Sequence, residues 1–485
     1  MINDYLDKPM RLQKYFVFGL IPFIVFILLI VASPTENAFV STLMVVFYLG
    51  ILAISYRWPW IIITITILTT TNFFHLYNLI YLPSLRIASG VTINFLDALL
   101  LGTVIISIIK LFTRKSLPLL TKPVILLYGI IGLSLAGSVL IQKSISLNAA
   151  VQDLRQTLAF IFYLSLAILI QTPKSRKIFF ALLTTVSIIS IGIHVYEFIT
   201  QARLVLPTSS PSFYSETRYI NVGGRMLPYL WNRAPNLLFL MYYIHLAKWF
   251  LTGKKRYIIF TSLAFISVSL SLVRFWFVAT VFLSILLSVF LYFKVPRTQN
   301  NIKKTTALIL IGLAVFLPFV AATTNILPAI FNRLISILNP SQEASVTIRL
   351  DATQIFWNNF VKNPILGNGP GSNQIIENQY GVWASDVGLV AALNQYGIFI
   401  IPVLIYLLSR ITKMMRSLSV AILSMDDKSF MYGIGTFFIL ALFSSISIQD
   451  YFFSQPWNYS VAIAVVLLEN TYKKVKNTNF SKRAG

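Results

Sequence analysis

Apolar runs long enough to cross a membrane recur along almost the whole chain. A transmembrane helix needs about 20 mainly apolar residues, and on that basis the sequence predicts about fourteen spans. They are residues 16–32, 38–56, 58–72, 92–110, 124–141, 152–170, 177–199, 235–251, 257–273, 274–293, 305–323, 388–408, 430–449 and 456–469. The pattern predicts an all-α polytopic membrane protein in which residues 1–485 form a single integral membrane domain.

Two polar stretches, 200–234 and 324–387, are too long to be simple connections between spans. Within the second, apolar positions recur at helical spacing, which predicts an amphipathic helix lying on a surface; they are Val346, Leu350, Thr353, Trp357 and Val361. Proline blocks helix continuation, so the helix should stop at Asn363-Pro364. The glycines at 367, 369 and 371 then allow tight backbone turns.

Composition supports a membrane protein and narrows its chemistry. The chain is 57% hydrophobic and 11% charged, with a mean hydropathy of +0.77, whereas soluble domains carry about 25% charged residues. The absence of cysteine excludes disulfides, thiolate metal ligands and a cysteine nucleophile. Since there are only three histidines and no acids at metal-ligand spacing, we predict no metal and no cofactor.

The net charge of +24 is explained mostly by topology. If the N-terminus is cytoplasmic, the inner segments collect 28 of the 39 Lys and Arg residues and the outer segments the remaining 11. Cytoplasmic loops of membrane proteins are enriched in basic residues. The distribution predicts an even number of spans, with both termini cytoplasmic, and gives no reason to expect a nucleic-acid partner.

Arginine dominates the basic residues on the predicted outer side. There, Lys143 and Lys362 stand beside nine arginines, which are Arg86, Arg155, Arg203, Arg218, Arg225, Arg233, Arg274, Arg333 and Arg349. The planar guanidinium group binds phosphate or carboxylate in bidentate fashion, whereas lysine acts as a point charge. The set favours binding of an anion at the outer surface. The alternative is that these arginines pair with outer acids, such as Asp153, Glu216 and Glu343, or with lipid headgroups.

Two of these arginines stand at informative positions. Arg274 lies in a tight hairpin between two predicted spans, where an arginine is costly unless it faces a polar cavity or an anion; the alternative is a snorkelling residue. Arg349 flanks the apolar stripe of the predicted helix, near Thr353 and Phe356. It could reach an anion at the membrane surface, or it could simply pair with Asp351.

Three further residues of the 324–387 stretch are candidates for the site. Asn368 and Gly369 lie in a glycine-rich segment whose backbone amides could bind an oxyanion, although the segment could equally be only a tight turn. Asp386 opens the next apolar run, where it could act as a general base or as a helix N-cap. Other isolated polar residues in the spans are interpreted as structural; they are Asp97, His194, Glu197, His245 and Asp450.

This stretch resembles a known family. The segments Arg349-Leu-Asp-Ala, then Phe356-Trp, then Asn363-Pro-Ile-Leu-Gly-Asn-Gly-Pro-Gly and Gln395-Tyr-Gly-Ile look like the signature of the O-antigen polymerase and O-antigen ligase superfamily. Arg274, after an apolar Ser-Leu run, resembles that family's outer-boundary arginine. The resemblance covers about residues 256–410, and the first 200 residues share only their membrane spans.

The resemblance implies a GT-C-like, inverting, metal-independent glycosyltransferase of the bacterial cytoplasmic membrane. Its donor and acceptor would be glycans linked to undecaprenyl diphosphate, and its active site would be extracytoplasmic, among membrane lipid. Arg274 and Arg349 would hold the diphosphate, and Asp386 would be the base at the position where the ligase branch has histidine. The outer loops would bind substrate; the residues concerned are Arg218, Arg225, Arg233, Asn368, Gly369 and Trp357.

Asp386 favours a polymerase of lipid-linked repeat units, working with a flippase and a chain-length regulator. One alternative is a ligase that transfers finished glycan to a lipid or protein acceptor. A second alternative is a lipid-linked oligosaccharide flippase, which should carry charges through the middle of its spans. Here the charges gather at one surface instead, beside two long loops.

Overall fold

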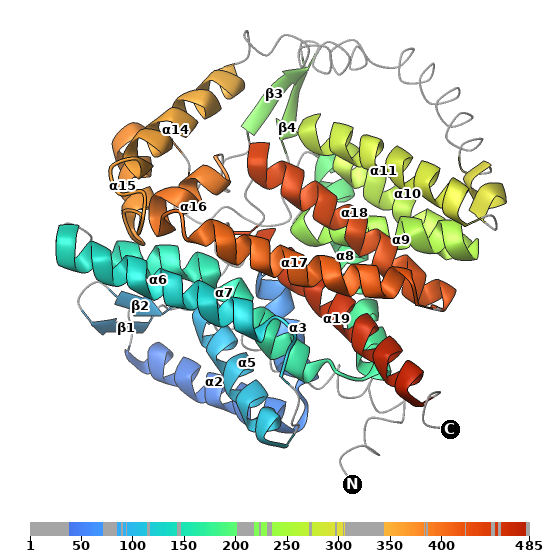
Figure 1. Ribbon diagram of the computed structural model, residues 1–485, viewed down its shortest axis with the longest axis horizontal. Coiled ribbons are helices and arrows are strands. Elements are labelled where there is room, and N and C mark those ends of the chain that lie inside the picture. Colours follow the sequence, from blue (N-terminus) through green and yellow to red (C-terminus); the bar gives the residue numbers. More distant parts are fainter. Residues whose placement is uncertain are drawn as a thin grey trace. The chain divides into compact units, whose positions relative to one another are not determined.

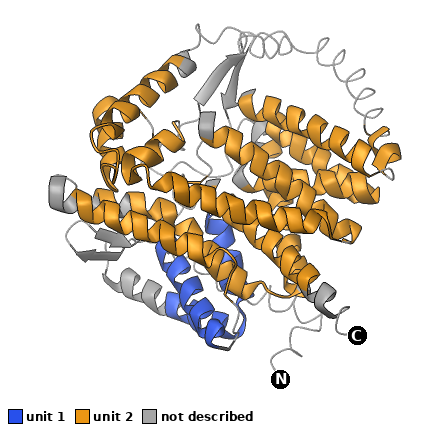
Figure 2. Cartoon of the chain, in the orientation of Figure 1, with its two compact units in different colours: residues 1–116, 205–216 blue, residues 117–204, 217–485 orange. Residues whose placement is uncertain are grey.

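The structure is a computed structural model, and it is mostly helical (Figure 1). It describes residues 38–70, 85–88, 91–93, 95–113, 117–142, 147–200, 218–222, 225–229, 235–270, 274–295, 298–303, 305, 344–382, 384, 387–421, 423–447, 452–453 and 457–481. The chain divides into two compact units (Figure 2): residues 1–116 with 205–216, and residues 117–204 with 217–485.

The first unit is a small helical body. Its described elements are α2 (Ala38–Arg57), α3 (Trp60–Thr70), β1 (Leu85–Ala88), β2 (Val91–Ile93) and α5 (Phe95–Thr113). The helices meet closely at Gly102, where an added Cβ would lie 2.4 Å from Leu52 Cδ2 and 2.9 Å from Ile62 Cδ1. The missing side chain therefore lets α5 approach α2 and α3. Thr66 and Thr103 join α3 to α5 through their hydroxyl groups, 3.3 Å apart.

The second unit holds the remaining elements. Its helices are α6 (Thr121–Gln142), α7 (Leu147–Leu169), α8 (Pro173–Thr200), α9 (Pro235–Thr252), α10 (Lys255–Leu270), α11 (Arg274–Lys294), α14 (Ala344–Phe360), α15 (Ser372–Tyr380), α16 (Leu389–Tyr396), α17 (Ile400–Ser419), α18 (Met425–Ser447) and α19 (Trp457–Ser481). Its strands are β3 (Arg218–Val222) and β4 (Arg225–Tyr229). The helices α9, α10, α11 and α18 lie side by side (Figure 1), and α19 packs along α7.

Helix α9 is buried on all sides within this unit. Every side chain from Leu237 to Leu251 is buried, as expected of a helix that is mostly apolar around its circumference, and two polar side chains among them, His245 and Lys248, contact other helices. Its closest neighbour is α18. At Gly433 an added Cβ would lie only 2.5 Å from Ile244 Cα, so the two backbones nearly touch there. Small residues at such crossings allow helices to pack closely.

Four of the described helices contain segments long and apolar enough to cross a membrane: Thr121–Ser138, Lys174–Tyr196, Phe275–Lys294 and Met425–Ser445. Of the predicted spans, 16–32 and 305–323 lie outside the described residues, Thr305 apart. The others coincide with helices, with one exception.

The exception is the predicted span 388–408, which is broken in two. Helix α16 ends at Tyr396, and α17 begins only at Ile400. Between them Gly397 has φ 71°, a left-handed conformation that favours glycine. An added Cβ there would lie 2.1 Å from the carbonyl oxygen of Ile365. The break thus follows from contact with a segment about thirty residues earlier in the chain, which hydropathy does not reveal.

Two short antiparallel hairpins accompany the helices, and the mostly helical structure is compatible with the predicted all-α membrane protein. Strands β1 and β2 pair in the first unit, and β3 and β4 pair within the predicted first long loop, 200–234. In the second hairpin, Arg225 pairs with Val222 beside the turn and Arg218 pairs with Tyr229 at the opposite end.

Candidate functional site

The stretch singled out by the sequence folds as three helices around a small core of its own. As predicted, α14 ends before Asn363-Pro364, at Phe360. Its Ala352 and Phe356 are fully buried against α15 and α16; the other core residues are Ile376, Val382, Ala384, Val387 and Ala391. Helices α14, α15 and α16 therefore form one packed substructure, the motif unit (residues 344–396).

The face that α14 buries differs from the predicted stripe. The buried residues are Ala352, Phe356 and Phe360, four residues apart. The predicted stripe lies on the adjacent face, where Leu350 and Trp357, together with Val361, are exposed. Helix α14 thus has two apolar faces, one packed on the motif unit and one left uncovered.

Arg349 belongs to the buried face rather than to the exposed one. It precedes Ala352 by three residues and Phe356 by seven, which places all three on one side of the helix. Its side chain is half-buried. It forms no ion pair with Asp351 or with any other acid that the structure describes. The simplest structural explanation of Arg349, a local pair with Asp351, is therefore absent.

The glycine-rich turn after α14 is deeply buried. Gly367, Gly369 and Gly371 have φ values of 73°, 84° and 96°. An added Cβ at Gly369 would lie 2.2 Å from Ser138 Cβ, on α6. At Gly367 and Gly369 side chains are excluded by both conformation and space, because the turn is pressed against its neighbours.

The amides of this turn are already occupied. Gly367 N donates to Asn363 O (2.9 Å), Asn368 N to Asn394 O (2.7 Å) and Gly369 N to Gln395 O (2.9 Å), while Gly371 N donates to Asp153 Oδ2 (2.6 Å). Pro370 has no N–H to offer. The segment therefore has the geometry of a tight turn, which was one of the two alternatives that the sequence allowed. Binding of an oxyanion by these amides would require the hydrogen bonds to break.

Asn368 belongs to a buried network of asparagine side chains. Asn394 Oδ1 accepts hydrogen bonds from Asn368 Nδ2 (2.8 Å) and Asn359 Nδ2 (3.2 Å). Asn363 Nδ2 donates to Asn368 Oδ1 (2.6 Å), and Asn394 Nδ2 donates to Asn373 Oδ1 (2.8 Å). Buried polar groups that are fully hydrogen-bonded fix one arrangement of the elements carrying them. The network therefore locks α14, the turn, α15 and α16 together.

Asp153 and Ser134 fasten this network to α7 and α6. Asp153 is 4% exposed, and its Oδ2 accepts hydrogen bonds from Gly371 N and from Gln395 Nε2. Ser134 Oγ donates to the main-chain carbonyl of Gln395 (2.6 Å). The sequence suggested Asp153 only as an ion-pair partner of an outer arginine. Its anchoring role had one sequence signal, which is the presence of an acid in the first turns of an apolar helix.

The other predicted site residues are placed only in part. Asp386 and Arg233 lie outside the described residues. For Arg274, Arg218 and Arg225 the structure describes the backbone, at the start of α11 and in the β3–β4 hairpin. Of the predicted site residues, the structure thus places four in the motif unit. Asn368 and Gly369 lie in its turn, and Arg349 and Trp357 lie on its helix α14. Within the described parts of the chain, no three acidic or histidine side chains are grouped as a metal site would need.

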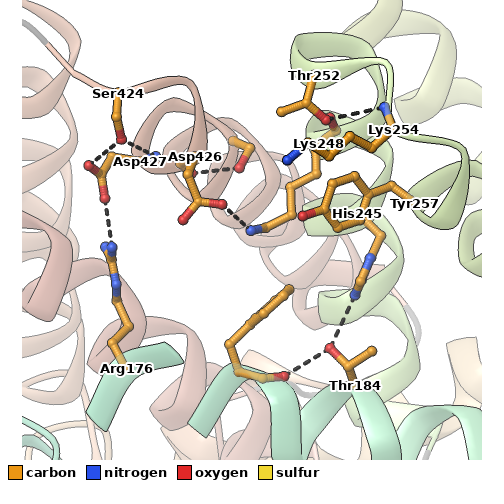
Figure 3. Close-up of polar contacts among 12 residues, drawn as sticks. Arg176, Thr184, His245, Lys248, Thr252, Lys254, Tyr257, Ser424, Asp426 and Asp427 are labelled. Carbon is orange, nitrogen blue, oxygen red and sulfur yellow. Dashed lines mark hydrogen bonds and ion pairs between the residues drawn. The ribbon is translucent and has the colours of Figure 1, made fainter. Parts of the chain in front are cut away.

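A second polar cluster joins helix ends that the charge pattern assigns to the inner side (Figure 3). Arg176 at the start of α8 lies 2.8 Å from Asp427 of α18, and Lys474 of α19 lies 2.6 Å from the same carboxylate. Lys248 of α9 pairs with the neighbouring Asp426. Residues predicted on one side of the membrane thus meet at one end of the bundle.

Aromatic rings complete this inner cluster. Lys248 Nζ lies 4.5 Å from the ring centre of Phe430 and 4.6 Å from that of Phe180. His245 stacks on Phe260, with ring centres 4.0 Å apart. Its Nε2 lies 3.2 Å from Thr184 Oγ1 (Figure 3). The ion pairs and ring contacts join α8, α9, α18 and α19, so the cluster works as a clamp between helices.

Neither a protein-family model nor a curated protein matches this chain.

Proposed function

We propose that this protein polymerises oligosaccharide repeat units carried on undecaprenyl diphosphate, at the outer face of a bacterial cytoplasmic membrane. The product would be a surface polysaccharide such as an O-antigen, capsule or exopolysaccharide. The proposal combines the motif resemblance with helices suited to a membrane.

The observation that best supports it is the setting of Arg349. The most distinctive part of the motif, from Asn363 to Gly371, is devoted to building a rigid buried support. That support carries α14, which holds Arg349 on its inward face without an ion pair to a described acid. A guanidinium group that projects from a fixed helix and is not neutralised by a described acid is suited to an anionic ligand such as a diphosphate.

The chemistry needs little more than binding and orientation. An acceptor hydroxyl attacks the anomeric carbon of the donor while the bond from that carbon to the diphosphate oxygen breaks. The bonding electrons leave with the diphosphate, where Arg349 and Arg274 would stabilise the developing charge. Asp386 would accept the hydroxyl proton. Attack opposite the leaving group inverts the anomeric centre, and the freed lipid diphosphate departs. Arg218, Arg225 and Arg233 are the candidates for holding the rest of the donor.

A ligase is the second candidate, because it would use the same donor and the same arginines. A deletion strain separates the two activities. Loss of a polymerase leaves single repeat units on the lipid carrier, whereas loss of a ligase leaves full-length chains there. We expect single repeats, and restoration of polymer by the wild-type gene but not by Arg349→Ala at equal membrane abundance. Full-length chains on the carrier would identify a ligase, and an unchanged lipid-linked pool would refute both.

A further inference from the structure

The exposed apolar face of α14 continues into a larger uncovered patch. Leu350, Trp357 and Val361 are 65%, 48% and 55% exposed, and Ile365, four residues further on, is 61% exposed. The N–H of Ile398 donates to the carbonyl of Pro364 (2.8 Å), which brings the α16–α17 junction beside Ile365.

At that junction Ile398 and Phe399 are 49% and 50% exposed. These residues form one exposed apolar patch, made of Leu350, Trp357, Val361, Ile365, Ile398 and Phe399. Neighbouring exposed apolar side chains of this kind, unlike singly scattered ones, mark an interaction site.

The position of the patch along the length of α6 indicates whether lipid or water contacts it. Ser134 Oγ donates to Gln395 O (2.6 Å), and a Cβ on Gly137 would lie 3.2 Å from Leu366 Cδ1. Both residues belong to the segment Thr121–Ser138, which is long and apolar enough to cross a membrane. With a rise of about 1.5 Å per residue, Ser134 lies about 6 Å inside the end of that segment. With this segment spanning the membrane, the lower part of the patch lies beside hydrocarbon rather than water.

The upper part has the composition of a membrane interface. Trp357 lies in the exposed stripe of α14, and tryptophan is enriched where hydrocarbon meets headgroups. Lys362 follows the helix and is exposed, where an ammonium group can reach lipid phosphates. Gln354 and Asn358 occupy the next sector of the helix and are also exposed. Helix α14 therefore presents one buried, one apolar and one polar sector.

We propose that this patch is immersed in the outer leaflet, so that α14 lies in the membrane interface with Leu350, Trp357 and Val361 among lipid. This assigns Trp357 to lipid rather than to a sugar ring. It also places Arg349, on the inward side of the same helix, at headgroup level. The lipid contact itself does not depend on the proposed function, whereas its use to present Arg349 to a lipid diphosphate does.

The absence of cysteine makes the test direct. Single cysteines replace Val361, Ile365 or Ile398, with Asn358→Cys as the matched control on the polar sector. Each variant receives a nitroxide label and enters vesicles of phosphatidylethanolamine and phosphatidylglycerol. Electron paramagnetic resonance then compares collisions with oxygen, which concentrates in lipid, and with a neutral nickel chelate, which stays in water. All four positions are exposed, so the substitutions should preserve the fold.

We expect labels at the three patch positions to collide mainly with oxygen and the label at 358 to collide mainly with the chelate. Chelate-dominated collisions at 361, 365 and 398 would place the patch in water and overturn the proposal. Labels inaccessible to both reagents would mean that protein covers the patch, with the same consequence. The readout requires no turnover, so loss of the polymerase proposal would leave this result standing, and the reverse also holds.

Discussion

The substitution Asp427→Ala should cost far more stability than an ordinary change at a helix end. Asp427 accepts charge-assisted contacts from Arg176 and Lys474, and the Arg176 and Asp427 side chains are only 2% and 3% exposed. Removing one partner of a buried ion pair costs about 3–5 kcal/mol, because the other charge is left buried without compensation. Asp427 also closes a reciprocal cap with Ser424, at 2.6 and 3.2 Å, and loss of a cap costs about 1 kcal/mol more.

A double-mutant cycle in detergent micelles measures this. The free energy of unfolding is obtained by denaturant titration for wild type, Asp427→Ala, Asp427→Leu, Arg176→Met and the double variant Asp427→Leu with Arg176→Met. The double variant should recover most of the loss, since buried pairs replaced by apolar residues are often neutral in stability. Thr471, which accepts from Arg176 Nη1, keeps a partner because its hydroxyl also donates to Leu467 O.

The control is Lys254→Ala, an exposed charge near the same cluster, which should change stability by less than about 0.5 kcal/mol. The reasoning fails if Asp427→Ala costs less than about 1 kcal/mol, or if the two single losses simply add in the double variant.

Two further predictions concern packing and the motif unit. Gly433→Ala should destabilise the protein by about 1–3 kcal/mol because its Cβ would meet the backbone of Ile244 at 2.5 Å. The control is Gly435→Ala in the same helix, whose Cβ would meet only the flexible end of a methionine side chain. Equal thermal unfolding of the two variants would contradict the prediction. Asp153→Ala should speed hydrogen exchange at the amide of Gly371, whereas Asp153→Asn, which keeps an acceptor oxygen, should largely preserve the protection of that amide. Hydrogen exchange of the 367–380 segment is measured by mass spectrometry. Unchanged exchange in Asp153→Ala would show that the carboxylate does not anchor the turn.

Hydropathy predicted the positions of most of the long described helices, because each contains a continuous apolar run, but it did not predict the polar helix α15. It could not predict the break at Gly397, which depends on contact with Ile365. It also could not choose between the two apolar faces of α14, since Leu350 and Phe356 are equally apolar and only the tertiary contacts of Phe356 decide. The β3–β4 hairpin was within reach, because Gly223-Gly224 between two short runs is a recognised hairpin signal.

At the candidate site, too, some features could be predicted from the sequence and others depend on tertiary contacts. Residue chemistry singled out Arg349, but the sequence placed it beside the stripe that is exposed, and only the burial of Ala352 and Phe356 shows that it lies on the packed side of α14. The role of Asp153 could not be predicted, because Gly371, whose amide it accepts, lies more than two hundred residues away in sequence. Asn368 attracted attention as a ligand-binding residue, yet its side chain is wholly engaged with neighbouring asparagines.

The central claim is tested most directly by turnover with a defined donor. Lipid-linked repeat units extracted from the deletion strain are incubated with purified protein in vesicles, and polymer length is measured. Wild type and Gln354→Ala, an exposed change on the same helix, should form polymer. Arg349→Ala should lose nearly all activity, and Arg349→Lys should recover little of it, since an ammonium group cannot replace the bidentate fork. Full polymer formation by Arg349→Ala, with folding intact, would contradict the account.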